Sequence, residues 1–316
     1  MTLSEHVRTL GRGPGRSRSL TQEEAFDAMD AMLSGQDAPE AVGALLMLLR
    51  MKGEVAEEIA GFAASAQAAL PNLPPVDLDW PSYAAGRTRG APWFLISAKL
   101  VANAGYRVLL HGWNGADQSV RANLTHAGIR VASSPSEAAK FLKQHRIAYL
   151  PLETHHPALF HLLNLRQVLG LRSCINTVCR MLNPGAADAS AQGVFHPSYR
   201  LLQADAAKRM GWDNLTVIKG GGGEFERHPA KTTEAFGLRS GAIWKRQYPA
   251  IRSEIRRLSG QKVSDGKTSI LQLNSTNFET DIIISTAALA LETLGKSDGL
   301  RAAENLWNDQ RATSTA

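Results

Sequence analysis

Residues 20–35 read LTQEEAFDAMDAMLSG, a stretch in which apolar side chains recur at the spacing of a helix. Thr21 can cap the start of this helix, and Glu24, three residues later, completes a capping box. The apolar residues 41–51 then predict a second helix that is buried nearly all round. With a third helix predicted over residues 55–70, the sequence indicates a small helical domain at the start of the chain.

The pattern changes after this domain. A proline-rich stretch spans residues 71–81, after which short apolar runs such as residues 107–110 alternate with helical ones, as in an α/β domain. We expect a helical domain over 1–76, with a later helical insertion near 156–172, and an α/β domain over 77–316. The central sheet of the larger domain is expected to be mixed, mainly parallel and flanked by helices.

Composition limits the class of protein. The 316 residues are 44% hydrophobic, enough for one large core beside a small helical domain. No apolar segment has the length of a membrane span, and the basic first twenty residues lack the apolar core of a signal peptide, so we expect a cytoplasmic protein without a membrane partner. Cys174 and Cys179 are expected to be a reduced pair.

Short motifs follow one another along the chain: Leu20-Thr21-Gln22-Glu23-Glu24-Ala25, Met51-Lys52-Gly53-Glu54, Glu57-Glu58-Ile59-Ala60-Gly61-Phe62, and His155-His156-Pro157-Ala158 with Arg166 after it. In this order they resemble the anthranilate phosphoribosyltransferase family over essentially the whole chain. The resemblance implies the two-domain fold of that family. It also implies a phosphoribosyl pyrophosphate donor held with magnesium and an anthranilate-like acceptor.

Residues 83–89 read YAAGRTR where the family carries the phosphate-binding loop Gly-Thr-Gly-Gly-Asp. Backbone N–H groups in such a loop approach a pyrophosphate closely, which glycine permits. Here Gly86 is the sole glycine, Tyr83 adds bulk, and Arg87 and Arg89 add positive charge. The resemblance therefore implies weakened binding of the sugar donor.

Residues 110–114 read LHGWN where the family has Lys-His-Gly-Asn-Arg. His111 and Gly112 match this motif. Trp113 and Asn114 replace the asparagine and the arginine, which removes a phosphate-binding cation and places an indole near the acceptor pocket.

Other family contacts are partly retained. Asn176 matches the family motif Asn-Leu-Leu-Gly-Pro, whose Gly-Pro is replaced by Cys179-Arg180, and Arg166 aligns with the arginine that meets the anthranilate carboxylate. The family's magnesium-binding Asp-Glu pair aligns with Phe225-Glu226. Because hard cations require clustered carboxylate oxygens, we expect no metal site here unless Glu224 substitutes for the lost ligand.

The replacements remove donor and metal contacts and bring in arginines, and the chain carries a net charge of +6. A divergent branch of the family, the YbiB-like proteins, keeps the fold without the biosynthetic activity and binds nucleic acid, and the chain resembles that branch. Our main hypothesis is a non-catalytic, largely sequence-independent nucleic-acid-binding protein that uses a basic groove and favours single strands, DNA or RNA. The expected contacts are Arg12, Arg16, Arg18, Arg87, Arg89, Trp113, Arg166, Arg172, Arg180, Lys219, Lys245 and Arg246.

The alternative is a phosphoribosyltransferase acting on an anthranilate-like aromatic acceptor. No catalytic residue and no cofactor are expected under the main hypothesis, and magnesium is expected only under the alternative. Trp113 has a further interpretation as a packed core residue, and Lys245 and Arg246 as part of a solvated face. A homodimer through the helical domain is expected in either case. The residual substrate pocket is expected to contain Tyr83, Gly86, His111, Gly112, Asn114, His156, Arg166 and Asn176.

Overall fold

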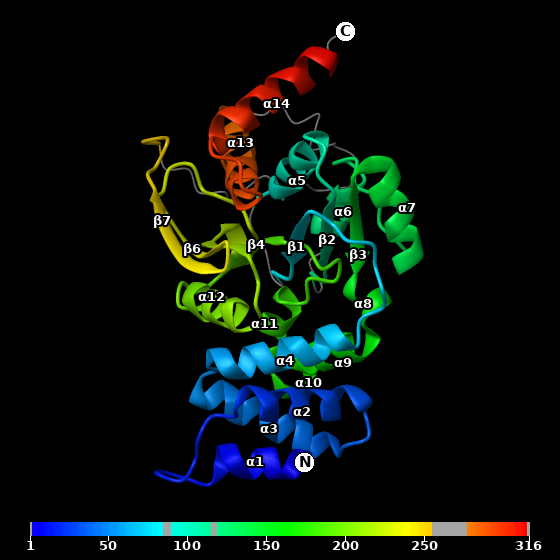
Figure 1. The fold of residues 1–316 in the computed structure, drawn as a ribbon, viewed down its shortest axis with the longest axis vertical. Coiled ribbons are helices and arrows are strands. Elements are labelled where there is room, and N and C mark those ends of the chain that lie inside the picture. Colours follow the sequence, from blue (N-terminus) through cyan, green and yellow to red (C-terminus); the bar gives the residue numbers. More distant parts are fainter. Residues whose placement is uncertain (1, 85–89, 115–118, 255–276, 315–316) are drawn as a thin grey trace.

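The computed structural model describes residues 2–84, 90–114, 119–254 and 277–314. Its helices and strands form a stack of layers, with a helical layer at one end and a larger α/β part beyond it (Figure 1). The helical layer consists of α1 (Leu3–Gly11), α2 (Gln22–Ser34), α3 (Pro39–Lys52) and α4 (Ala56–Ala68).

The sequence signals for α2 are realised in the structure. The Thr21 hydroxyl accepts a hydrogen bond from the Glu24 backbone N–H at 3.2 Å, and the Glu24 carboxylate accepts one from the Thr21 N–H at 2.9 Å. Gly35 ends the helix in the left-handed conformation, with φ of 68°. The predicted capping box is therefore confirmed.

Helices α2 and α4 pack closely because Gly61 has no side chain. A Cβ atom added to Gly61 would lie 2.2 Å from the Gln22 carbonyl oxygen and 2.7 Å from the Ala25 Cβ. Both contacts are with parts of the chain that cannot rotate away. The glycine therefore fixes how near the two helices approach each other.

We expect Gly61→Ala to lower the free energy of unfolding by about 1–3 kcal/mol, because the added methyl group overpacks the α2–α4 contact. Gly43→Ala in α3 is the matched control, since its Cβ would meet only the Leu169 side chain at an ordinary 3.7 Å. The better helix propensity of alanine predicts a gain of up to about 1 kcal/mol there. Urea denaturation of both variants measures the difference, and effects of the same sign would contradict the packing argument.

In the described part of the chain the sheet has seven strands, in the order β3-β2-β1-β4-β5-β6-β7. Neighbouring strands from β3 to β5 pair in parallel, whereas β6 and β7 are added in antiparallel orientation. The mixed, mainly parallel sheet predicted from the sequence is confirmed. Its strands are β1 (Leu78–Ser82), β2 (Val108–Gly112), β3 (Ile147–Pro151), β4 (Ala189–Val194), β5 (Asn214–Lys219), β6 (Thr233–Arg239) and β7 (Ala242–Tyr248).

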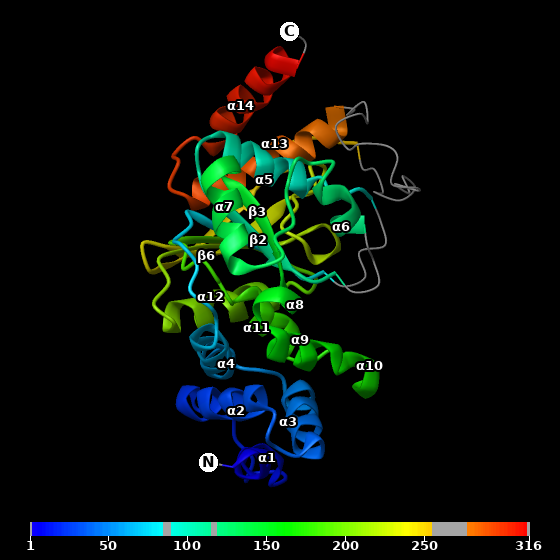
Figure 2. The same cartoon turned by 90° about the vertical axis from the view of Figure 1, so that its right-hand side faces the viewer.

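Helices cover both faces of the sheet (Figures 1 and 2). One face carries α5 (Phe94–Asn103) and α13 (Asn277–Thr293), with α14 (Gly299–Ser314) outside them. The other face carries α11 (Ile175–Arg180) and α12 (Tyr199–Arg209), which lie between the sheet and α4. The remaining helices are α6 (Ser119–Leu124), α7 (Pro135–His145), α8 (Leu152–His155), α9 (Pro157–Asn164), α10 (Arg166–Leu169) and the short η1 (Gly221–Gly223).

The core follows these layers. Trp80 of β1 packs between Phe94 and Phe225, with its ring centroid 5.3 Å from that of Phe225. A second core joins the opposite sheet face to the helical layer, where Tyr83 and the free, buried Cys174 and Cys179 are enclosed. Since α9 also contacts α2, the helical layer is packed against segments from both halves of the chain. The predicted domain boundaries stay a prediction.

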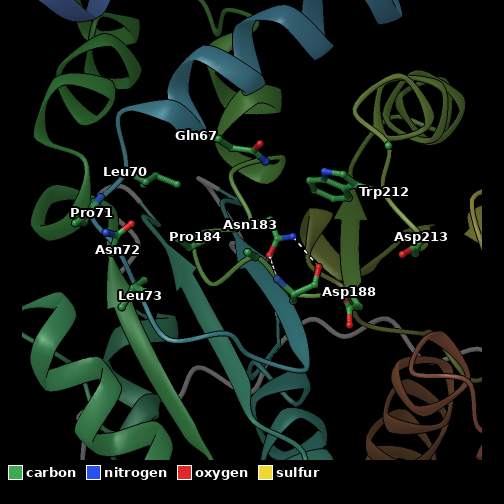
Figure 3. A pocket seen from close by; sticks show the side chains of 13 residues that line it. Gln67, Leu70, Pro71, Asn72, Leu73, Asn183, Pro184, Asp188, Trp212 and Asp213 are labelled. Atoms are coloured by element: carbon green, nitrogen blue, oxygen red, sulfur yellow. Dashed lines mark hydrogen bonds between the residues drawn. The ribbon is translucent and has the colours of Figure 1, made fainter.

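A pocket of about 380 Å³ opens beside the linker between α4 and β1 (Figure 3). Its walls come from the end of α4, from residues 70–73, and from the segments just before β4 and β5. Asn183 shapes one wall, because its side chain both donates to the Ala187 carbonyl oxygen and accepts from the Ala187 N–H. The pocket lies at the amino ends of β4 and β5. Ligands of parallel sheets bind at the carboxyl ends of the strands, so the candidate active site is sought at the opposite edge of the sheet.

Candidate active site

The carboxyl ends of β1, β2, β4 and β5 meet at one edge of the sheet, because these strands are parallel. Glu224, which follows β5 and η1, reaches across this edge and is fully buried. Its Oε1 atom accepts hydrogen bonds from the Ser82 hydroxyl at 3.0 Å and from the Ala84 N–H at 3.1 Å, and lies 3.4 Å from Asn114 Nδ2. One carboxylate thus ties together the segments that leave β1, β2 and β5.

A second buried network lies beneath this edge. His111 Nδ1 is 2.8 Å from the Tyr83 hydroxyl oxygen, and His111 Nε2 is 3.0 Å from Asp79 Oδ1. Asp79 Oδ2 accepts a hydrogen bond from the Ser190 hydroxyl at 2.6 Å. Burial raises the pKa of Tyr83, so its hydroxyl stays protonated and donates to His111 Nδ1.

Tyr83, His111 and Asp79 have no exposed surface. Tyr83 and His111, two of the eight residues expected in a substrate pocket, are therefore placed inside the core, where they fix the end of β1 against β2. Gly112 is part of the same arrangement, because a Cβ atom there would lie 1.9 Å from the Ser82 carbonyl oxygen.

Two small pockets lie between this edge and the helical layer. One is lined by Trp113, Leu163, Arg166, Arg172, Ser173 and Asn176. The Trp113 ring packs edge-on against Phe160, with centroids 5.7 Å apart, and Asn176 Nδ2 donates to the Tyr83 carbonyl oxygen at 3.3 Å. The structure thus brings together Trp113, Arg166, Arg172 and Asn176.

Arg180 is buried, with 6% of its surface exposed. Its Nε donates to the Gly193 carbonyl oxygen at 3.0 Å and its Nη1 to the Asn176 carbonyl oxygen at 2.8 Å. Burial lowers the pKa of Arg180, and the charge of Glu224 opposes that shift. The residue that replaces the family's proline therefore holds α11 against the end of β4.

The other expected cationic residues are spread over the molecule. Arg12, Arg16 and Arg18 are exposed in the segment after α1, where Arg18 pairs with Glu24 at 2.6 Å. Lys219 ends β5, and Lys245 and Arg246 lie on the outer strand β7. In Figure 1, helices α2–α4 and α12 lie between β7 and α1. Gly86, Arg87 and Arg89 lie outside the described residues.

His155 and His156 have structural roles. His155 Nδ1 donates to the Pro151 carbonyl oxygen at 2.7 Å, and its ring meets His111 edge-on. His156 caps α9 and lies with Nε2 3.1 Å from the Ala66 carbonyl oxygen, across to α4. Burial lowers the pKa of His155 to about 3.

The shift of His155 predicts a loss of stability in acid. Its pKa is about 6.5 when unfolded and about 3 when folded, so the unfolded chain takes up the proton first and unfolding becomes easier as the pH falls through that range. In His155→Asn, which keeps a donor for the Pro151 carbonyl, we expect the urea midpoint to fall less between pH 7 and pH 4.5 than in the parent. The exposed His161→Asn is the control, and parallel curves for His155→Asn and the parent would contradict the assignment.

The described residues do not fit a magnesium site. No group of three or more His, Cys, Asp or Glu side chains that could hold a metal ion occurs among residues 2–84, 90–114, 119–254 and 277–314. Glu224 is engaged by the donors above, and Glu226 Oε2 accepts from the Phe94 N–H at 3.0 Å. Both carboxylates are buried, and Glu224 Oε1 and Glu226 Oε2 accept hydrogen bonds from the protein, so these two oxygens are not open to magnesium.

A helical layer on a mainly parallel sheet, with a cationic pocket between them, is the architecture of a two-domain glycosyl transferase. Residues 4–69 match the helical bundle domain of the glycosyl transferase family, and residues 94–313 match its a/b domain. The chain belongs to this family.

Its relatives include two enzymes named anthranilate phosphoribosyltransferase. That of Caldivirga maquilingensis is 28% identical, over 95% of this chain and 93% of its own. That of Chromohalobacter salexigens is 28% identical, over 94% of this chain and 90% of its own.

Among solved structures, anthranilate phosphoribosyltransferase (TrpD) from Thermus thermophilus superposes with a TM-score of 0.79 at 21% identity, covering 96% of this chain and 93% of its own. The Saccharomyces cerevisiae enzyme in complex with PRPP and Mg gives a TM-score of 0.76 at 18% identity, covering 96% and 92%. These likenesses establish the fold.

The main hypothesis from the sequence, a non-catalytic nucleic-acid-binding protein, is wrong. The relatives that span the chain are transferases, and the comparisons give no support for the YbiB-like branch or for nucleic-acid binding. In the structure the Arg180 guanidinium is buried and donates to the Gly193 carbonyl oxygen. Among the described residues no helix is both long and apolar enough to span a membrane.

Several residues of the site were not predicted. Asp79 of β1 lies beside His111 and accepts a hydrogen bond from Ser190 of β4. Arg50, Ser173 and Gln203 line the pockets. The one usable signal was Asp79, an acidic residue inside an apolar strand, where an unpaired charge would be unfavourable.

Proposed function

We propose that the protein transfers a phosphoribosyl group from phosphoribosyl pyrophosphate to the amino group of an anthranilate-like aromatic acid. The support is similarity to anthranilate phosphoribosyltransferases along nearly the whole chain, including 28% identity over 95% of it. The observation that carries the proposal is the pocket of Trp113, Arg166, Arg172, Ser173 and Asn176, which combines an aromatic ring with cationic and polar groups.

The acceptor's carboxylate would bind between Arg166 and Arg172, because a guanidinium group pairs with a carboxylate through two parallel hydrogen bonds. The acceptor's ring would lie against Trp113. The pocket has a volume of only about 10 Å³, so the half-buried Trp113 ring must turn outward to admit a benzoate-sized molecule. Acceptor binding is therefore an induced fit that disturbs the Trp113–Phe160 contact.

The donor would lie over the carboxyl ends of β1 and β2, beside Ala84 and Asn114, which Glu224 holds in place. In the reaction the acceptor nitrogen forms a bond to C1 of the ribose, the bond from C1 to pyrophosphate breaks, and the amine loses a proton. No step is assigned to magnesium, because Glu224 Oε1 and Glu226 Oε2 already accept hydrogen bonds from the protein. The residues shown hold and orient the reactants.

Pyrophosphate release tests this function. The protein is supplied with phosphoribosyl pyrophosphate and magnesium chloride, together with anthranilate, aniline or benzoate. We expect release with anthranilate and little with aniline, which lacks the carboxylate, or benzoate, which lacks the amine. Release no faster than in the absence of protein with any aminobenzoate would refute the proposal.

We further propose the homodimer through the helical layer that the sequence led us to expect. It would cover Met51 of α3 and Val168 of α10, whose side chains are 83% and 82% exposed. Exposed apolar side chains of this size on α3 of the helical layer and on α10 suit an interface between copies.

A further inference from the structure

A charged pair of side chains lies where strands β2 and β3 end, beside the proposed donor position. Helix α6 begins shortly after β2, and α8 follows β3 directly, so both helices start at the carboxyl edge of the parallel sheet. Across this edge, Arg121 of α6 and Glu153 of α8 form an ion pair through their Nη2 and Oε1 atoms. The segments that leave β2 and β3 are therefore joined by two opposite charges.

Tyr149 of β3 connects this pair to Asn114. The Tyr149 side chain is fully buried, and the Arg121 guanidinium carbon lies over its ring, 6.0 Å from the centroid. Burial raises the pKa of Tyr149, so its hydroxyl stays protonated and donates to Asn114 Oδ1 at 3.4 Å. One tyrosine thus contacts both Arg121 and the residue that borders the proposed donor position.

The ion pair is open to solvent, and therefore to a ligand. The Arg121 and Glu153 side chains are 29% and 30% exposed. An ion pair with this much exposure contributes little to stability, because water weakens the attraction and both side chains lose conformational freedom. A guanidinium group also has five N–H donors, more than one carboxylate occupies. An anion that binds a guanidinium strongly can therefore take the place of Glu153.

We infer that Arg121 binds a phosphate group of the sugar donor, and that Glu153 holds its guanidinium at the edge of the sheet until the donor replaces the carboxylate. The inference rests on the proposed function, because it adds a residue to the donor position beside Ala84 and Asn114. Asn114 has no charge to offset that of a phosphate. A guanidinium group does, and it forms parallel hydrogen bonds to two phosphate oxygens at once.

A purely structural ion pair predicts a different outcome from a ligand site. If the pair only joined α6 to α8, removing either charge would disturb the edge of the sheet in the same way. If Arg121 binds phosphate, the two charges act in opposite directions, because the Glu153 carboxylate competes with the donor for Arg121 and repels its phosphate. The sign of the change at Glu153 therefore separates the two roles.

Calorimetric titration with phosphoribosyl pyrophosphate and magnesium chloride, in the absence of an acceptor, measures that sign. Arg121→Gln is expected to weaken donor binding by about tenfold or more, because it removes a charged hydrogen-bond donor. Glu153→Gln is expected to strengthen donor binding by about two- to fivefold, because it removes the competing partner of an exposed pair. Should Arg121→Gln fail to fold, Glu153→Gln still decides, since a structural pair does not predict tighter binding.

Arg209→Gln is the matched control. Arg209 also forms an exposed ion pair, with Glu57. Helix α12 runs from the end of β4 back to the start of β5, so Arg209, its last residue, lies at the opposite edge of the sheet. This variant is expected to keep the donor affinity of the parent.

Titrations with pyrophosphate and with ribose 5-phosphate show which end of the donor Arg121 contacts. The ligand whose affinity falls more in Arg121→Gln carries the phosphate that this side chain binds. The inference is overturned if Arg121→Gln binds phosphoribosyl pyrophosphate as the parent does, or if Arg121→Gln and Glu153→Gln shift the affinity in the same direction. It is also overturned if the parent does not bind the donor at millimolar concentration.

Failure of this inference can be told apart from failure of the proposed function. If the parent releases pyrophosphate with anthranilate while Arg121→Gln keeps the parent's donor affinity, only the role of Arg121 is refuted. If the parent releases no pyrophosphate but loses donor affinity in Arg121→Gln and gains it in Glu153→Gln, the phosphate contact stands and the transfer to anthranilate is refuted.

Discussion

Glu58→Ala is expected to lower the free energy of unfolding by about 3–5 kcal/mol, because it removes one partner of a buried ion pair. Glu58 has no exposed surface and pairs with Lys52 Nζ at 2.9 Å. The same carboxylate accepts from the Leu20 N–H before α2 and the Val55 N–H before α4, each at 3.0 Å. One side chain therefore joins α2, α3 and α4, and its loss leaves several donors without an acceptor.

Urea denaturation of Glu58→Ala and of Glu57→Ala gives the matched comparison. Glu57 pairs with Arg209 of α12 where both side chains are more than a third exposed, so its loss should change stability by about 1 kcal/mol or less. The two variants differ by one position in the same helix. If both lost the same stability, the central role of Glu58 in the helical layer would be refuted.

The largest effect on activity is expected at Arg166. Under the proposed function, Arg166→Gln lowers kcat/KM for anthranilate by about 10- to 150-fold, which corresponds to the 1.5–3 kcal/mol of a hydrogen bond to a charged group. Arg166 begins α10 and lines the pocket beside Trp113. The loss should be confined to acceptors that carry a carboxylate.

Steady-state kinetics with anthranilate and with aniline separate a lost carboxylate contact from a general loss of structure. The slow reaction with aniline should be nearly the same in Arg166→Gln and the parent. Arg301→Gln, which removes an exposed charge on α14, should keep the parent's kcat/KM. An equal loss with both acceptors would show that Arg166 does not recognise the carboxylate.

The helical layer was predictable because its signals are local. Thr21 and Glu24 cap α2 within three residues of each other, and the apolar spacing over α3 is continuous. Strand β1 was not predicted, since Asp79 and Pro81 are unfavourable residues for a strand. Distant partners hold it in place: Asp79 is stabilised by Ser190 of β4 and His111 of β2.

The site was less predictable. A comparison of motifs shows which family side chain has been replaced, but it does not show where the new side chain lies in the fold. Arg180 was expected in a cleft; it borders a small pocket, and its buried guanidinium donates to the Gly193 carbonyl oxygen. Trp113 was expected either on a groove or in a core, and it is half-buried beside Phe160. Arg166 and Asn176 were expected at family positions of one site, and the structure brings both to one pocket.

Mass spectrometry of the reaction product tests the central claim most directly. The protein is incubated with phosphoribosyl pyrophosphate, magnesium chloride and anthranilate, and the mixture is analysed for the acceptor joined to a phosphoribosyl group. The account predicts this adduct, accumulating with time and absent when benzoate replaces anthranilate. Anthranilate recovered unchanged, with the donor intact or merely hydrolysed, would contradict it.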